Sequence, residues 1–230
     1  FMPVNKEINT QHDFDTIIKA MKKDADPAVK QKMTRFGISN DTALGVSAPK
    51  LKAIAKPYKK RHDLAVMLWD CGIHEARLLS SYIDNPAVIT AKEMERRVKQ
   101  FDSWDICDGA CMLVFDRTPF AFDKAYAWAA KKEEFVKRAG FVMMASIAVH
   151  NKKLDDRELL PFFDEIIKGA DDERNFVKKA VNWALRQLGK RSSFLHPHAM
   201  ETIRKLYALN NKTAAWIARD AEKELSSPAT

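Results

Sequence analysis

The chain has little glycine, little cysteine and no long apolar run. Its 230 residues include seven glycines, under half of the usual share of roughly 7%, which argues against a turn-rich all-β fold. No apolar run approaches the roughly 18 residues that a membrane span needs, so we expect neither an integral membrane protein nor a membrane partner. The three cysteines are an odd number, and the first residues lack the apolar core of a signal peptide. Both features predict reduced thiols and a cytoplasmic protein.

The motifs of several common enzyme classes are also missing. The sequence contains no G-x-G-x-x-G, Walker A, H-E-x-x-H or G-x-S-x-G pattern, which excludes ordinary nucleotide-cofactor enzymes, zinc proteases and α/β-hydrolases. Cys107 and Cys111 lie four residues apart, but no histidine or second cysteine pair has the spacing of a structural zinc site. We interpret both as small core residues. We therefore expect no metal and no cofactor.

Basic residues are in excess over acidic ones. The chain has 39 Lys and Arg against 31 Asp and Glu, a formal net charge of +8, which favours a polyanionic partner. Residues 50–61 and 174–191 each contain six basic residues and no acid. We expect these segments to line one DNA-binding groove, with Lys50, Lys52 and Lys56 contributing from the first. The alternative is a pair of solvated helix faces.

Helical periodicity runs through almost every long segment. Phe14, Ile17, Ile18 and Met21 recur at the spacing of one buried helix face. The same pattern predicts further helices over residues 65–83, 93–98, 103–115, 134–150, 159–167, 176–188 and 214–225. Short breaks separate them at residues 84–86, 117–119, 151–153, 168–169 and 196–198. Because no stretch alternates as a strand does, the sequence predicts an all-α fold.

The predicted helices also repeat along the chain. Residues 135–139 and 176–180 match in five consecutive positions by residue or residue type, 41 residues apart, and residues 216–221 are a weaker echo. A period near 40 with two helices per unit is typical of HEAT-like repeats, which stack into a curved α-solenoid. We expect residues 1–230 to form one such domain with a basic concave groove.

The segment that begins at Ser103 carries two aspartates beside a tryptophan. Trp104 and Asp108 are four residues apart and share a helix face. Ser103 is placed to cap this helix, and Asp105 suits its first turn, where negative charge is favoured. Asp108 lies a turn further in, among apolar residues, where a carboxylate needs a cationic partner or serves a cationic ligand.

A second segment combines cations with an aromatic residue on one stripe. Lys179, Trp183, Arg186 and Lys190 recur at helical spacing, and Arg138 occupies the same column as Lys179 in the preceding repeat. A core stripe would not carry three charges, and a solvated face seldom carries a tryptophan. Cations that meet phosphates and rings that meet sugars or bases suit a nucleic acid.

The residues His74, Glu75 and Arg77 form a third polar group. Glu75 and Arg77 are two residues apart, so on a helix they point in different directions. We interpret them as structural residues, each paired with a neighbouring helix.

Taken together, these residues resemble a known family, the AlkD-like DNA alkylation repair glycosylases built from HEAT-like repeats. The resemblance runs from about Phe36 to Leu225, and the first 30 residues match least. No single landmark is specific, but their order and spacing are; they comprise Phe36-Gly37, Leu44-Gly45-Val46, Leu68-Trp69, His74-Glu75-Ala76-Arg77, Ser103-Trp104-Asp105-x-x-Asp108, Lys137-Arg138-Ala139, Phe176-Val177-x-Lys179-Ala180-x-x-Trp183-x-Leu185-Arg186 and Ala218-Arg219-Asp220.

The resemblance implies a reaction and a site. Such enzymes wrap duplex DNA and hydrolyse the N-glycosidic bond of positively charged N3- or N7-alkylated purines, without flipping the base into a pocket. By motif, Asp108 would stabilise the developing oxocarbenium-like sugar and orient a water. Trp104 and Trp183 would hold the deoxyribose, and Arg138 would bind the neighbouring phosphate. The enzyme would be monofunctional, since no catalytic lysine is required.

Other functions are compatible with the same residues. A non-catalytic HEAT-repeat module that binds DNA or RNA explains the charge and the stripe but leaves Asp108 without a role. A protein–protein scaffold predicts binding that is insensitive to duplex DNA. For the glycosylase we expect a monomer in the cytoplasm, associated with the nucleoid when it is bound to DNA.

Overall fold

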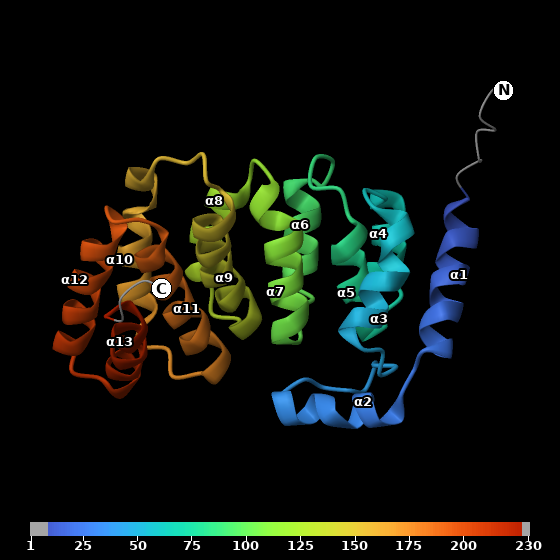
Figure 1. Ribbon diagram of the computed structural model, residues 1–230, viewed down its shortest axis with the longest axis horizontal. Helices are drawn as coiled ribbons and strands as arrows, with labels where there is room; N and C mark the ends of the chain where they lie inside the picture. Colours follow the sequence, from blue (N-terminus) through green and yellow to red (C-terminus); the bar gives the residue numbers. More distant parts are fainter. Residues whose placement is uncertain (1–8, 227–230) are drawn as a thin grey trace. The chain divides into compact units, whose positions relative to one another are not determined.

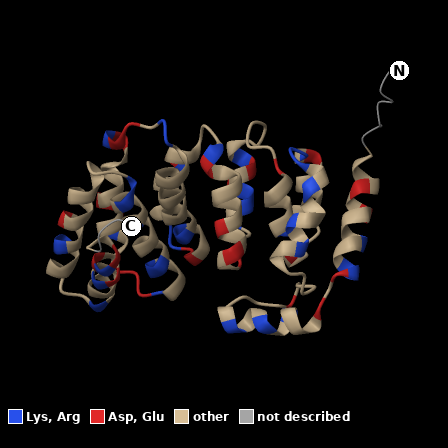
Figure 2. Ribbon diagram, viewed as in Figure 1, with Lys and Arg blue, Asp and Glu red and all other residues tan. Residues whose placement is uncertain are grey.

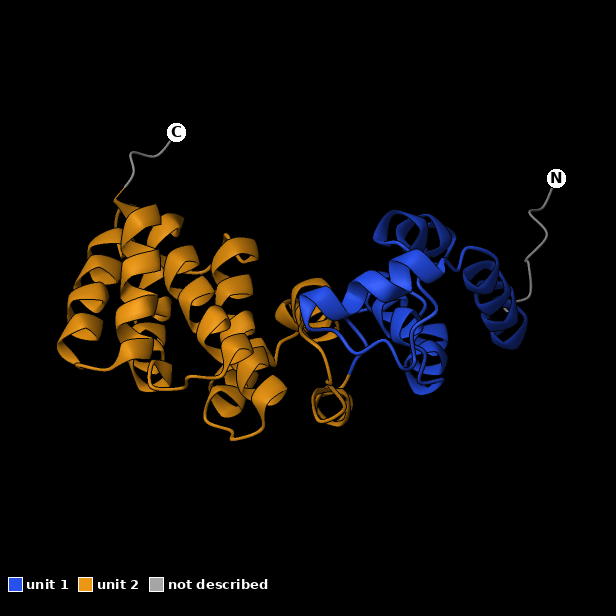
Figure 3. Ribbon diagram, turned by 90° about the horizontal axis from the view of Figure 1, so that it is seen from below, with its two compact units in different colours: residues 1–89 blue, residues 90–230 orange. Residues whose placement is uncertain are grey.

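The computed structural model describes residues 9–226, and these residues form α-helices and short 3-10 helices without a β-strand (Figure 1). The predicted all-α class is therefore confirmed. The chain divides into two compact units, one ending at Ile89 and the other beginning at Thr90 (Figure 3). That residues 1–230 act as one domain stays a prediction.

Unit 1 is built on a core of aliphatic side chains from its α-helices. Its elements are α1 (Thr10–Lys23), α2 (Pro27–Met33), η1 (Thr34–Phe36), α3 (Ala48–Ala55), η2 (Lys56–Tyr58), α4 (His62–Asp70) and α5 (His74–Ile83). Buried side chains from α1, α3, α4 and α5 meet in this core, among them Ile17, Met21, Leu51, Leu64, Leu68 and Leu79. The continuous helix predicted over residues 65–83 is wrong, because Gly72 takes a φ of 77° that a right-handed helix does not allow and separates α4 from α5.

Unit 2 contains the helices that carry the predicted catalytic residues. Its elements are α6 (Ala91–Val98), α7 (Trp104–Leu113), η3 (Phe115–Arg117), α8 (Ala121–Ala129), α9 (Glu134–His150), η4 (Asp156–Leu159), α10 (Pro161–Gly169), α11 (Asn175–Arg191), α12 (Leu195–Ala208) and α13 (Lys212–Leu225). Most residues of α9 are buried, because α7, α8 and α11 all pack against it. This helix is the centre of the unit.

The repeat seen in the sequence appears in the packing of α9 against α11. Phe135 and Phe176, which stand 41 residues apart, open these two helices, and their ring centroids lie 5.6 Å from each other. Equivalent positions of consecutive repeats are thus in contact, as stacked HEAT-like units require.

Two helix starts illustrate what local sequence determines. The side chains of Thr90 and Asn211 accept hydrogen bonds from the backbone N–H groups at the beginnings of α6 and α13, as N-caps do. The predicted break at residues 196–198 is wrong. Pro197 lies in the first turn of α12, where a proline has no intrahelical hydrogen bond to lose.

Candidate functional site

The start of α7 explains why one of its two aspartates is structural. Ser103 stands at the N-cap position, but its hydroxyl donates to Asp105 Oδ1 at 2.7 Å instead of capping the backbone. Asp105 Oδ1 also accepts from the backbone N–H of Ile106 at 3.0 Å. Asp105 thus serves the first helical turn, as expected, while the direct cap expected from Ser103 is wrong.

Asp108 has the cationic partner that its surroundings require, and this partner is Arg138 of α9. Arg138 Nε donates to Asp108 Oδ1 at 2.9 Å, and Nη2 donates to Oδ2 at 2.8 Å. This bidentate arrangement fixes the orientation of both the carboxylate and the guanidinium. Only 16% of the Asp108 side chain and 8% of the Arg138 side chain are exposed.

Burial affects the two charges of this pair differently. It raises the pKa of Asp108 above its ordinary value, and the hydrogen bonds and charge of Arg138 oppose that rise. Burial also disfavours the charged form of Arg138. The hydrogen bonds and the negative charge of Asp108 outweigh this effect of burial, so the pKa of Arg138 is raised. Arg138 therefore stays positively charged beside the Asp108 carboxylate.

Arg138 also connects three helices. Its Nη1 donates to the backbone carbonyl of Phe176, in the first turn of α11, at 2.6 Å. The buried thiols of Cys107 and Cys111 on α7 donate to the backbone carbonyls of Phe135 and Ala139 on α9. The two cysteines are core residues, as predicted, and they hold α7 against the helix that carries Arg138.

The two predicted tryptophans keep part of their surface exposed. Trp104 lies one helical turn before Asp108 on α7, and Trp183 lies on α11 between buried neighbours. Trp104, Asp108, Arg138 and Trp183 come from three helices that pack in one unit, because α9 contacts both α7 and α11. Their contacts with a sugar stay a prediction.

The cations of the stripe on α11, which are Lys179, Arg186 and Lys190, differ in whether they are paired with a carboxylate. Lys179 is exposed. Arg186 and Lys190, in contrast, both donate to the carboxylate of Glu224 on α13, a helix that carries acids as well as bases (Figure 2). A phosphate would compete with Glu224 for these two cations, whereas Lys179 would bind one without that competition.

A second pair of an aromatic and a cationic residue, which was not predicted from the sequence, lies next to this stripe. The ammonium of Lys178 on α11 lies 5.0 Å from the ring centroid of Trp216 on α13. The two residues are 38 positions apart, close to the period near 40 of the predicted repeats. This spacing, read as a repeat period, could have predicted that the two residues lie on neighbouring helices.

The basic segment of unit 1 is exposed at Lys50, Lys52 and Lys56. Lys50 lies 3.6 Å from the carboxylate of Asp24, and Lys52 lies 5.9 Å from the ring centroid of Tyr82. These are loose surface contacts that leave the ammonium groups in solvent. That this segment and α11 line one groove stays a prediction.

Glu75 is structural, as expected, but its partner is a loop. Its carboxylate accepts the backbone N–H groups of Leu44, Gly45 and Val46 at 2.9, 2.6 and 3.1 Å, and only 2% of the residue is exposed. The expectation of a neighbouring helix as the partner of Glu75 is thus wrong. Gly45 in this loop has a φ of 88°, and a Cβ there would lie 2.2 Å from the backbone carbonyl oxygen of Asp26.

Over the described part of the chain, no group of three or more His, Cys, Asp or Glu is arranged to hold a metal ion. The helices within residues 9–226 include none with the length and apolar character to cross a membrane.

Comparisons with known proteins show the fold and the family of the chain. The chain is similar to a solved structure described as "a new family of proteins related to the HEAT-like repeat DNA glycosylases with affinity for branched DNA structures", with a TM-score of 0.77, 18% identity and coverage of 93% of this chain and 94% of the other. This likeness shows the HEAT-like fold. No curated protein matches the sequence. Residues 17–225 match the family described as DNA alkylation repair enzyme, and the chain belongs to that family.

Proposed function

We propose that the protein is a monofunctional DNA glycosylase that hydrolyses the N-glycosidic bond of N3- or N7-alkylated purines in duplex DNA, without base flipping. The observation that carries this proposal is a buried carboxylate, Asp108, held by Arg138 next to a partly exposed tryptophan. An acid lowers affinity for phosphates, so a surface used only for binding gives Asp108 no role beyond its pairing with Arg138. Membership of the DNA alkylation repair family supports the same conclusion.

The chemistry requires little beyond charge stabilisation. Alkylation gives the purine a positive charge, so the bond between C1′ and the base breaks with both electrons going to the base, which leaves neutral. The sugar becomes oxocarbenium-like, and a water molecule bonds to C1′ and releases a proton. Asp108 would stabilise the positive sugar and orient this water. Because only 16% of its side chain is exposed, solvent would screen that interaction little.

Arg138 would have two tasks in this mechanism. It fixes the plane of the Asp108 carboxylate, so the oxygens need no reorganisation when the sugar becomes charged. Three of the five N–H donors of a guanidinium are engaged with Asp108 and Phe176. The remaining donors would bind the phosphate beside the lesion, the role that the resemblance to the glycosylase family implies.

Trp104 and Trp183 would hold the deoxyribose between their rings, and their faces would stabilise its positive charge. Because the charged base leaves readily by itself, no pocket for an extruded base is required, and bulky adducts would be tolerated.

Binding to the DNA backbone would come from the exposed cations. Lys179 and the unit 1 residues Lys50, Lys52 and Lys56 are exposed to solvent, and Arg186 and Lys190 would join them by leaving Glu224. Each phosphate contact releases counterions, so duplex affinity should fall steeply as salt is raised. The proposed partner is duplex DNA containing alkylated purines, bound by a monomer.

The test is release of N7-methylguanine from methylated duplex DNA. We expect the wild-type protein to release the free base and leave an uncleaved strand with an abasic site, without a borohydride-trapped covalent complex. Asp108→Asn should retain duplex binding and lose release. Folded wild-type protein that binds duplex without releasing base would contradict the proposal.

The second candidate is a DNA-binding module without glycosylase activity, which the similarity to a protein with affinity for branched DNA favours. It predicts tighter binding to a four-way junction than to a linear duplex of the same length. Equal affinity for both, together with base release, would exclude it.

A further inference from the structure

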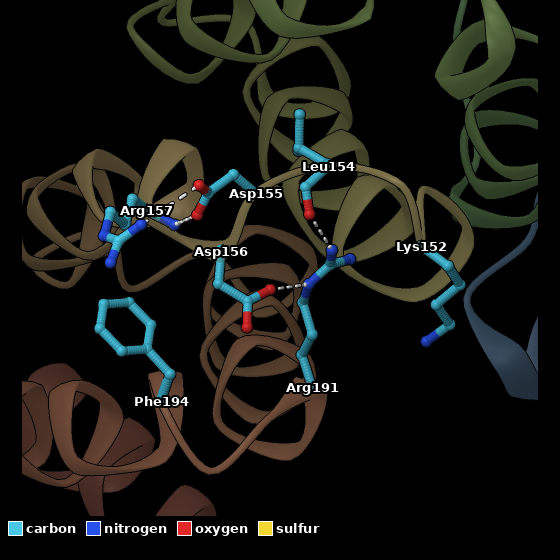
Figure 4. A pocket seen from close by; sticks show the side chains of 7 residues that line it. All are labelled: Lys152, Leu154, Asp155, Asp156, Arg157, Arg191 and Phe194. Carbon is cyan, nitrogen blue, oxygen red and sulfur yellow. Dashed lines mark hydrogen bonds and ion pairs between the residues drawn. The ribbon is translucent and has the colours of Figure 1, made fainter.

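A recess separate from the catalytic residues lies at the other end of α9 and α11 (Figure 4). The link between α9 and α10 forms one wall, and the start of α12 forms the other. Its volume of about 430 Å³ is within the range of small-ligand sites. The side chains that line it include Lys152, Asp155, Asp156, Arg157, Arg191 and Phe194.

Arg191 makes this recess a fixed part of the fold. Its Nη1 donates to the backbone carbonyls of Ala148 and Asn151 at 2.8 and 2.9 Å, and its Nη2 donates to that of Leu154 at 2.9 Å. Its Nε donates to Asp156 at 2.6 Å, and only 5% of the side chain is exposed. Arg191 thereby caps the C-terminal end of α9 and secures the wall that follows it.

The two carboxylates at the recess are both engaged. Asp155 accepts the backbone N–H of Arg157 at 2.9 Å and caps η4. Asp156 is bound by Arg191, and this contact lowers its pKa below the ordinary value. Arg157 Nη1 also donates to Asp155 Oδ2, at 3.4 Å, so Arg157 is engaged with this carboxylate as well.

Apart from Leu154, the other side chains that line the recess are Phe194, Arg157 and Lys152, one aromatic and two cationic. The Phe194 residue is 41% exposed, although it is a large apolar residue. The Arg157 guanidinium lies 5.9 Å from its ring centroid, and 77% of the Arg157 side chain is exposed. Lys152 lies on the other side of Arg191 from Phe194 and Arg157 in Figure 4, and among residues 9–226 no carboxylate lies within ion-pair distance of its ammonium.

We propose that this recess binds one unpaired nucleotide of a nucleic-acid strand, with its base against Phe194, its own phosphate at Arg157 and a phosphate further along the strand at Lys152. An exposed ring flanked by cations is the arrangement that binds single strands, because every base has a face that can stack and every nucleotide a phosphate. Bases inside a duplex are already stacked, so only an unpaired one can reach the ring. The proposal rests on the proposed binding of DNA, but not on base release.

The recess is far from the catalytic residues. Arg138 links the first turns of α9 and α11, and Arg191 links their last turns, so the two helices run side by side in the same direction. The rise of 1.5 Å per residue from Arg138 to Asn151 gives a separation of about 20 Å along α9. A nucleotide held here belongs to another part of the nucleic acid than the lesion.

The experiment compares a blunt duplex with the same duplex carrying a single-stranded overhang that contains 2-aminopurine, whose fluorescence changes on stacking. Wild-type protein should bind the overhang substrate more tightly and alter its fluorescence. Phe194→Leu should lower overhang affinity about fivefold or more and abolish the fluorescence change, while blunt-duplex affinity and N7-methylguanine release stay unchanged. Arg157→Gln and Lys152→Ala should weaken overhang binding without abolishing the stacking signal.

Two exposed residues outside the recess supply matched controls. Phe36 lies in unit 1 and is 64% exposed, and Lys153 is the exposed neighbour of Lys152. We expect the Phe36→Leu and Lys153→Ala variants to bind the overhang as tightly as wild type does. Unlabelled dAMP as a competitor distinguishes the sources of the nucleotide. We expect no displacement at millimolar dAMP, whereas full displacement would make the recess a site for free nucleotides and overturn the strand proposal.

The failures of the two proposals can be told apart. If Phe194→Leu binds the overhang as tightly as wild type does, the recess proposal is refuted while duplex binding and base release stand. If wild-type protein binds neither substrate, the proposed DNA binding is wrong and the recess proposal falls with it.

Discussion

Replacing Arg138 by methionine tests how the Asp108–Arg138 pair contributes to stability. Methionine retains an apolar stem but removes all three hydrogen bonds of the guanidinium. Removing one partner of a buried ion pair costs about 3–5 kcal/mol, because the other charge stays buried alone. Since 16% of the Asp108 side chain is exposed, we expect the lower end, about 3 kcal/mol.

A double replacement separates this charge effect from a loss of packing. Asp108→Leu alone strands the guanidinium, whereas Asp108→Leu with Arg138→Met leaves no buried charge. Replacing both partners of a pair by apolar groups is close to neutral, so the double variant should be more stable than either single variant by about 2 kcal/mol.

The assay is urea unfolding followed by tryptophan fluorescence, which reports mainly on unit 2 because only Trp69 of the five tryptophans lies in unit 1. Arg204→Met is the matched control, because Arg204 is 71% exposed and pairs only with Glu201 of its own helix in the described part of the chain. Its loss should cost under about 1 kcal/mol. An Arg138→Met variant as stable as this control, or a double variant as unstable as the sum of the single ones, would refute the reasoning.

Three further predictions concern other parts of the fold. Glu75→Gln should destabilise unit 1 by about 2–3 kcal/mol, measured by urea unfolding, because an amide nitrogen then faces backbone N–H donors; unchanged stability would contradict the role of this carboxylate. Gly140→Ala should lower the melting temperature strongly, because the added Cβ would lie 2.2 Å from the backbone nitrogen of Ala129. Gly72→Ala is the control: its Cβ would meet no atom within 4 Å, so only the strain of the positive φ should destabilise that variant. The bonds of Arg174 lower the pKa of Asp172 from 3.8 to about 2, so this carboxylate contributes stability above its ordinary pKa and loses it as the pH falls towards 2. Asp172→Asn should therefore flatten the acid limb of stability against pH, and an unchanged limb would exclude this contribution.

Periodicity predicted much of the helical structure because each helix buries one face. The matching starts of α9 and α11 even predicted their stacking, which the contact between Phe135 and Phe176 confirms. Periodicity failed at Gly72 and Pro197, where the backbone conformation of one residue decides whether a helix breaks or begins.

The site could be predicted only as far as residue types allow. The need of Asp108 for a cation followed from its apolar neighbours, but the choice of Arg138, 30 residues away, depends on how α7 packs on α9. The stripe on α11 gave no sign that Glu224 would bind two of its cations, because that contact depends on the packing of α13. Ion pairs between helices depend on how the helices pack, so the sequence of either helix alone does not predict them.

The measurement that tests the central claim most directly is the single-turnover rate of N7-methylguanine release from a defined duplex. Asp108→Asn and Asp105→Asn make the same chemical change on the same helix, but only Asp108 is paired with Arg138. We predict that Asp108→Asn loses release by about 100-fold or more, the scale of one positioned catalytic group, while Asp105→Asn stays within a few fold of wild type. Equal rates for wild type and Asp108→Asn would contradict the account.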